Sequence, residues 1–243
     1  MDNQQDISEI SNIVVTTINW FLSTSPNYSV VPPSQNSSNR EFWPDHVNVS
    51  TLAWVTNQGW DTETSICALA IGSRFTTGYS YDMLRGAALH NAILPVVVQA
   101  LQSQEINAMA EWSFSRAELG ISGRVDLYIP ECATVELKTT SATRRTPYKY
   151  ELIQCGLYAY LVAPCILVVA SVSQNRVIIR RQISSAQGES LSRDAIGLLE
   201  EYHRWRKELN PSPNEPLAIG RCSICSYNWI CERNQDIRFV RWR

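Results

Sequence analysis

The sequence predicts an α/β fold with a mixed central β-sheet flanked by helices. Two observations lead to this prediction: strand-type and helix-type patterns alternate along the 243 residues, and two pairs of short β-rich runs are each joined by a tight turn. The first pair meets at Pro130 and Glu131, and the second pair meets at 173–175. The expected strands are 124–129, 134–139, 165–172 and 176–183, and a helix over 147–163 separates the two pairs.

Further helices are expected on both sides of these strands. Residues 6–22 carry apolar side chains at helical spacing, and residues 190–209 form an amphipathic pattern that Asn210 and Pro211 end. Another helix is expected from Ser80, with Pro95 kinking or ending it. We divide the chain into an N-terminal extension (1–60), a core (61–215) and a cysteine-containing segment (216–243).

Composition limits the possible functions. The chain is 44% hydrophobic and 18% charged, which is typical of a globular protein with a sizeable core. Its net charge of −2 means that nucleic-acid binding would need a local basic surface. The acidic, polar start of the sequence argues against a signal peptide, so a cytoplasmic location is expected. The uncharged window 152–175 is interrupted by Pro164 and polar residues, so we interpret it as a helix followed by a strand and expect no membrane partner.

The first strand pair carries a group of acidic and basic residues. Glu136 and Lys138 alternate with Leu137, so both project from the same face, and Asp126 can meet Glu136 across the pair. Carboxylates are ligands for hard cations such as Mg²⁺, and a nearby lysine can orient a hydrolytic water. The alternative is two amphipathic strands whose polar faces are simply solvated.

Three other segments carry candidate site residues. Gly86 precedes His90 by four residues, which leaves room for a close approach beside an imidazole able to bind a divalent ion. Gln154 and Tyr158 share a helix face and could bind phosphate near an acidic cleft, or could be ordinary helix surface. The polar connection before them contains Arg144 and Arg145, which are candidate DNA-binding residues.

The seven cysteines suggest a metal centre. Cys222, Cys225 and Cys231 are spaced to wrap one soft metal or cluster, and Cys67 is the candidate for a fourth ligand. Zinc and an iron–sulfur cluster both accept four thiolates, so the residues alone do not decide between zinc and a cluster. The other three, Cys132, Cys155 and Cys165, are expected to be buried thiols.

Taken in order, these motifs resemble the RecB-like branch of the PD-(D/E)xK nuclease superfamily, and more narrowly the CRISPR-associated exonucleases that carry an iron–sulfur cluster. The resemblance covers roughly 67–231 and implies a restriction-endonuclease-like core, with the cluster region joining the N- and C-terminal parts. It implies that Mg²⁺ or Mn²⁺ binds His90, Asp126, Glu136 and the Leu137 carbonyl, and that Lys138 positions the water. It further implies that Gln154 and Tyr158 place the DNA, and that Cys67, Cys222, Cys225 and Cys231 hold a cluster, [4Fe–4S] in preference to [2Fe–2S].

The same resemblance implies a function and partners. We expect a DNA exonuclease that acts on single strands and ends and trims DNA for CRISPR spacer acquisition, with integrase proteins as partners. The alternatives are a stand-alone RecB-like repair or viral exonuclease, a non-catalytic cluster-bearing DNA-binding subunit, and a zinc-ribbon binding module. Residues 1–60 would be a variant extension, an oligomer contact or a lid on the DNA path.

Overall fold

A computed structural model describes residues 6–24, 46–60, 62, 65–66, 68–69 and 81–209. Cys67 and the C-terminal cysteine segment fall outside these ranges. Nothing in the structure therefore bears on the predicted metal-binding cysteines or on the division of the chain into three parts.

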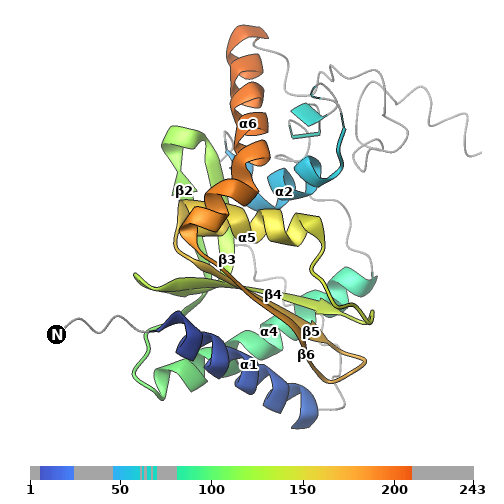
Figure 1. Cartoon of the computed structure of the whole chain (residues 1–243), viewed down its shortest axis with the longest axis vertical. Helices are drawn as coiled ribbons and strands as arrows, with labels where there is room; N and C mark the ends of the chain where they lie inside the picture. The colour runs from blue at the N-terminus through green and yellow to red at the C-terminus, as the bar shows by residue number, and fades with distance from the viewer. Residues whose placement is uncertain are drawn as a thin grey trace, which may run out of the picture.

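The described strands form one mixed, six-stranded sheet (Figure 1). Its order is β1-β3-β4-β5-β6, and β2 pairs with β3 outside this path. The pairs β1–β3 and β4–β5 are parallel, and the other neighbouring strands are antiparallel. The bounds are β1 Val47–Asn48, β2 Met109–Arg116, β3 Ile121–Ile129, β4 Ala133–Thr140, β5 Cys165–Ser171 and β6 Arg176–Ile183.

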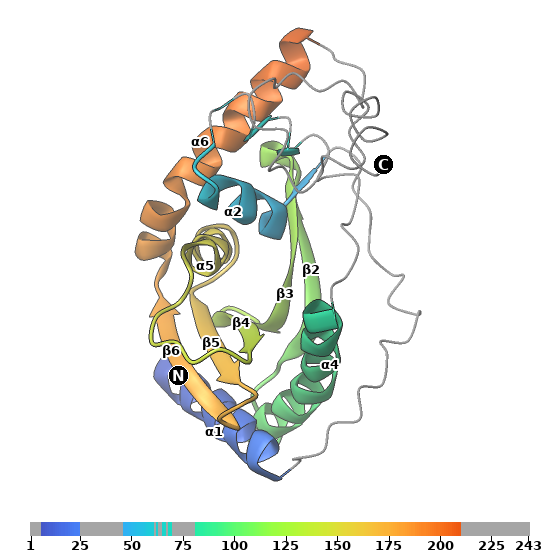
Figure 2. The same cartoon turned by 90° about the vertical axis from the view of Figure 1, so that its right-hand side faces the viewer.

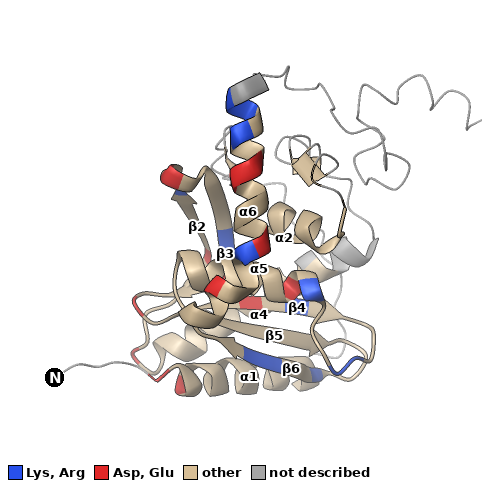
Figure 3. Cartoon of the chain, turned by 45° about the horizontal axis from the view of Figure 1, so that its top comes forward, with Lys and Arg blue, Asp and Glu red and all other residues tan. Residues whose placement is uncertain are grey.

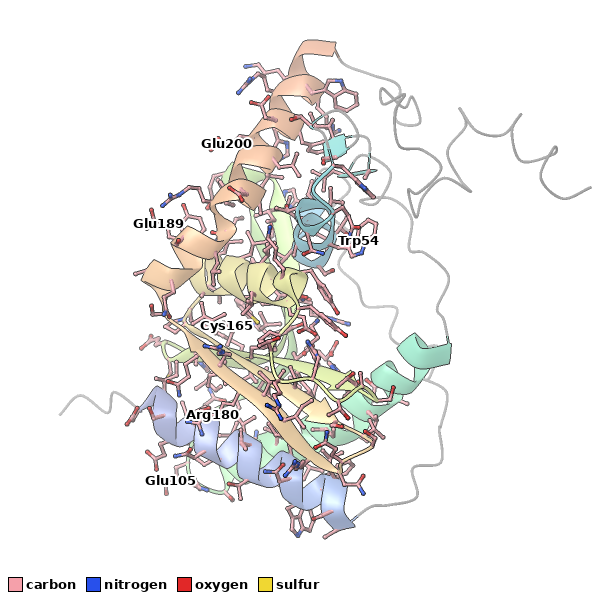
Figure 4. All side chains as sticks on the ribbon, turned by 45° about the vertical axis from the view of Figure 1, so that its right-hand side comes forward. Trp54, Glu105, Cys165, Arg180, Glu189 and Glu200 are labelled. Atoms are coloured by element: carbon pink, nitrogen blue, oxygen red, sulfur yellow. The ribbon has the colours of Figure 1, made fainter. Side chains whose placement is uncertain are left out.

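Helices cover both faces of the sheet (Figure 2). On one face lie α1 (Ile7–Thr24) and α4 (Tyr81–Gln102), and on the other lie α2 (Val49–Asn57), α5 (Lys149–Leu161) and α6 (Ser185–Leu209). The central strand β5 shows why two layers are needed, because every residue in it is buried. Ile166, Val168 and Ala170 join the core under α1 and α4, whereas Cys165, Leu167 and Val169 join the core under α5. Cys165 is labelled in Figure 4, at the start of β5.

Helix α5 is enclosed between the sheet and the helices α2 and α6. Nine of its thirteen residues are buried, so its sequence lacks the one-sided apolar pattern of a surface helix. Close contact with α6 depends on two glycines: a Cβ at Gly156 would lie 2.7 Å from the Cβ of Leu191, and one at Gly188 would lie 2.7 Å from the Cβ of Ala159. The outer side of α6 is exposed at Glu189 and Glu200 (Figure 4). Because α5 is fixed on several sides, any polar side chain that it directs at the sheet is held in place.

The prediction of a mixed sheet flanked by helices is confirmed. The strand β6 has the expected bounds, β5 ends one residue earlier than expected, and α1 and α5 differ from expectation by one or two residues at each end. Two differences are informative: α4 continues through Pro95, and α6 begins five residues earlier than the apolar pattern indicated. None of the described helices combines the length and the apolar character that crossing a bilayer requires.

Candidate active site

The site begins where β3 and β4 cease to pair. Their ladder ends at Leu127 and Val135, and the next contact is made by a side chain: the Leu137 N–H donates to Oδ2 of Asp126 over 2.7 Å. The carboxylate therefore takes the place of a backbone acceptor. This bond fixes the position of Asp126 and keeps the strands together where the ladder stops.

Strand β4 contributes two charged groups to the α5 side of the sheet. Val135 and Leu137 belong to the core under α1 and α4, so the alternation of the strand turns Glu136 and Lys138 the other way. The two side chains interact directly, with 2.6 Å between Nζ of Lys138 and Oε1 of Glu136. Glu136 is 3% exposed, which is unusual for a carboxylate unless it is paired or functional.

Helix α5 completes a hydrogen-bonded chain above these groups. The Gln154 amide donates to Oε1 of Glu136 (2.8 Å) and accepts from Nζ of Lys138 (3.0 Å), so one side chain positions both charges. Its Nε2 also lies 3.2 Å from Oη of Tyr158, and that hydroxyl donates to the Arg124 carbonyl over 2.8 Å. The chain thus links β4, α5 and β3 through buried polar contacts.

His90 reaches the site from α4. Its Nδ1 lies 3.6 Å from Oδ1 of Asp126, the oxygen that does not accept from Leu137. Gly86, one turn earlier on the same helix, lies close to β4, because a Cβ there would be 3.2 Å from Oγ1 of Thr139. The predicted close approach at this glycine is present, and the contact is made with the strand that carries Glu136 and Lys138.

The two carboxylates, Glu136 and Asp126, differ in the direction of their pKa shifts. Burial and the neighbouring Asp126 carboxylate raise the pKa of Glu136 to about 7, even though the Lys138 ammonium acts in the opposite direction. Burial alone would raise the pKa of Asp126, but the charges of His90 and Lys138 and the Leu137 N–H outweigh it and lower that pKa. Asp126 is therefore ionised at neutral pH, whereas Glu136 is close to half protonated.

The two basic groups respond to the same carboxylates. Burial alone would lower the pKa of His90, but Asp126 and Glu136 outweigh burial and raise it. The pKa of Lys138 likewise lies well above its ordinary value, because the attraction of Glu136 and Asp126 outweighs its burial. Lys138 is consequently a fixed cation and hydrogen-bond donor in this arrangement, and does not act as a base near neutral pH.

The donor set fits a hard divalent cation. Within the described part of the chain, no three His, Cys, Asp or Glu side chains are already arranged as a closed ligand group. Yet Oε2 of Glu136 is buried and has no hydrogen-bond partner among these residues, and such an orphaned oxygen is costly. A cation shared by Asp126 and Glu136 would satisfy this oxygen and remove the repulsion that raises the pKa of Glu136.

The structure separates the two arginines proposed for DNA binding. Arg144 is 10% exposed and forms a two-pronged ion pair with Glu151, with both N···O distances at 2.7 Å. Arg145 is exposed. Of the two, the side chain of Arg145 is available to a ligand from solution, whereas Arg144 is engaged within the protein.

The three cysteines in the described ranges form no disulfide with one another. Cys155 and Cys165 are buried and Cys132 is partly buried, close to the sequence expectation. Burial raises the pKa of the Cys155 thiol well above its ordinary value, so this group is not a ready thiolate ligand.

Sequence reasoning missed two residues around the site. It gave Glu151 no role, although this residue fixes Arg144 and caps α5, because burial at a helix start leaves no local pattern. It also passed over Tyr148, which stands beside Arg144 with an exposed ring. The signal for Tyr148 was present, since two tyrosines flank Lys149 a few residues after the basic pair Arg144 and Arg145.

Comparison with known proteins gives fold-level likeness. No protein-family model matches this chain, and no curated protein sequence does. Among solved structures, a "Putative exonuclease" from Eubacterium rectale aligns with a TM-score of 0.52 at 15% identity, over 83% of this chain and 92% of that chain. An alkaline exonuclease from Laribacter hongkongensis aligns with a TM-score of 0.49 at 14% identity, over 68% of this chain and 92% of its own. The protein SSO0001 aligns with a TM-score of 0.47 at 18% identity, over 94% and 98% of the two chains.

Proposed function

We propose that this protein is a metal-dependent nuclease that hydrolyses phosphodiester bonds of DNA. The observation that carries the proposal is the pair formed by the partly buried Asp126 and the buried Glu136 beside the fixed cation Lys138, with one Glu136 oxygen lacking any described partner. Burying two acids costs stability, so the arrangement favours a functional role over a structural one. The shared fold with the Eubacterium rectale structure, which is named as an exonuclease, supports the same class of reaction.

Each side chain has a defined role in this proposal. A divalent ion held by Asp126, Glu136 and His90 would supply Lewis-acid activation of the phosphodiester and of the attacking water. Lys138, permanently protonated, donates to the water or to the non-bridging oxygens and stabilises the negative charge that builds up on the phosphoryl group. Gln154 fixes the positions of the Lys138 and Glu136 side chains through two hydrogen bonds, and Tyr158 links Gln154 to β3 through hydrogen bonds.

We further propose that the enzyme acts as an exonuclease on single strands and ends, and that Cys67, Cys222, Cys225 and Cys231 hold an iron–sulfur cluster. The support is the order of the sequence motifs, with trimming of DNA for CRISPR spacer acquisition as the corresponding role. These cysteines lie outside the described residues. Iron and sulfide analysis of anaerobically purified protein tests the cluster: iron with visible charge-transfer absorbance supports it, and zinc without such absorbance contradicts it.

The decisive experiment is degradation of end-labelled single-stranded DNA with Mg²⁺, with Mn²⁺ and with a chelator. Wild type should degrade the DNA only with a metal, and Asp126→Asn and Lys138→Met should each lose about 10³-fold in rate. Glu131→Gln is a matched control, because this exposed carboxylate lies in the turn between the same two strands. Equal activity in all four proteins, or activity that survives the chelator, would contradict the proposed site.

A further inference from the structure

An exposed tyrosine stands at the start of α5, where the connection from β4 enters the helix. Tyr148 is 49% exposed, which is high for a large ring that has stacking partners. The guanidinium of Arg144 lies over this ring at 4.0 Å from the centroid. The ring of Tyr150 is nearly parallel to it, with 17° between the planes and 5.8 Å between the centroids. Together the rings of Tyr148 and Tyr150 form a flat, partly exposed aromatic surface, which we call the tyrosine surface.

This surface is held rigidly. Arg144 is pinned by its two bonds to the buried Glu151, and it also donates to the Thr146 carbonyl. Glu151 in turn accepts from the Tyr148 backbone N–H over 2.9 Å, which closes a capping box at the start of α5. The tyrosine backbone and the cation under its ring are thus fixed by the same carboxylate. A ligand that stacks here would order few additional groups.

The tyrosine surface adjoins the candidate active site. The connection that carries it leaves β4 directly after the strand of Glu136 and Lys138, and Gln154 follows on the same helix. Tyr150, which stacks on Tyr148, is four residues before Gln154 and so lies on the same side of α5. We therefore expect a strand bound at the carboxylates to continue towards Tyr148.

Two exposed cations lie close to Tyr148 in the sequence. Arg145 and Lys149 are exposed, and neither forms an ion pair with any residue in the described part of the chain. The nearby Glu151 is already neutralised by Arg144. Figure 3 shows basic and acidic segments side by side where the connection enters α5, and in the sequence Arg144, Arg145 and Lys149 outnumber the one acidic residue there, Glu151. The local balance is therefore basic, although the net charge of the chain is −2.

We propose that Tyr148 is a stacking platform for an unpaired nucleobase of the DNA strand that enters the site, with Arg145 and Lys149 binding the phosphates on either side. An aromatic face bordered by cations suits single-stranded DNA, whose bases are free to stack, and the contact does not depend on base identity. Paired bases within a duplex present no free face. This inference rests on the proposed nuclease function and assigns the selection of single strands to a particular residue.

The test measures binding separately from cleavage. A fluorescent single-stranded oligonucleotide is titrated, with a chelator present, against wild type and Tyr148→Ala, and the titration is repeated with an oligonucleotide that carries abasic sites throughout. Tyr148→Ala should weaken binding of the base-bearing strand about tenfold and leave binding of the abasic strand unchanged. Tyr148→Phe should retain wild-type binding, because the ring is preserved.

Tyr160→Ala is the matched control. This tyrosine is 45% exposed on the same helix, but twelve residues further along, about 18 Å of helix rise from Tyr148. Loss of binding to both strands in Tyr148→Ala, or an equal loss in Tyr160→Ala, would overturn the platform. The nuclease proposal is judged separately by metal-dependent degradation in wild type: if wild type degrades DNA and Tyr148→Ala binds the base-bearing strand normally, the platform alone fails.

Discussion

Two buried glutamates, fifteen residues apart, show the contrast between a carboxylate that holds the fold and one that is available for chemistry. Glu151 on α5 and Glu136 on β4 are 1% and 3% exposed. Glu151 has both oxygens satisfied, by the two prongs of Arg144 and by the Tyr148 N–H. Glu136 receives Lys138 and Gln154 on one oxygen, while the other has no partner in the described structure.

The two acids differ in whether both carboxylate oxygens have hydrogen-bond partners. A planar guanidinium matches both oxygens of a carboxylate, so Glu151 is complete without any ligand. Burial and the nearby Asp126 raise the pKa of Glu136 to about 7, because the single positive charge of Lys138 only partly offsets them. Burial alone therefore does not distinguish a structural acid from a functional one. The two acids are distinguished by the number of satisfied oxygens and by the presence of a second carboxylate, Asp126, near Glu136.

The largest difference between the two acids is expected in activity. Glu136→Gln removes the charge but keeps the shape and the hydrogen bond to Gln154, and should lower metal-dependent DNA degradation about 10³-fold. Glu151→Gln, assayed at a temperature where it is folded, should stay within about tenfold of wild type. Single-turnover rates on labelled single-stranded DNA measure both. Equal losses in the two variants would remove the distinction drawn here.

The order should reverse for stability. Glu151→Ala leaves the guanidinium of Arg144 largely buried without its partner, and should lower the free energy of unfolding by about 3 kcal/mol. Urea denaturation at neutral pH gives this value. Replacing both partners, as in Arg144→Met with Glu151→Leu, should recover most of the loss, because no unpaired charge then remains. A single variant as stable as wild type would show that the ion pair contributes little.

Stability should depend on pH through Glu136. Its pKa in the folded protein is raised from an ordinary 4.5 to about 7, so the stability that it contributes is complete below pH 4.5 and is lost as pH rises towards 7. In metal-free protein, Glu136→Gln should therefore gain on wild type by about 2 kcal/mol between pH 5 and pH 8. Melting temperatures across this range, with a chelator, provide the test. If the difference in melting temperature between the two proteins stays the same across this pH range, the pKa of Glu136 is not raised in the folded protein.

The smallest effect is expected at the end of the hydrogen-bonded chain. Tyr158→Phe removes the bond to the Arg124 carbonyl and the contact with Gln154, and should cost about 1 kcal/mol in stability. Because Gln154 retains its bonds to Glu136 and Lys138, activity should fall by less than about tenfold. Chemical denaturation and the same nuclease assay check both values. A loss as large as that of Glu136→Gln would place Tyr158 among the groups that act on the substrate.

Much of the layout could be predicted because it depends on local periodicity. Alternation along 134–139 placed Glu136 and Lys138 on one face, and helical spacing placed Gln154 and Tyr158 on one face. The structure brings these four side chains together with Asp126 and His90. Sequence reasoning did not foresee that Arg144 turns inward, because its partner Glu151 is buried only once α5 has packed between the sheet and α2 and α6.

The sequence by itself determined the alternation of strands and helices, the sharing of faces by neighbouring side chains, and the identity of the groups capable of hydrolytic chemistry. The tertiary structure alone decided which of those groups became buried, which oxygens found partners, and how charge was balanced among them. The physical reason is distance. Periodicity acts over one or two turns of chain, whereas desolvation and hydrogen bonding depend on residues that are dozens of positions apart and meet only when the sheet and its helices pack.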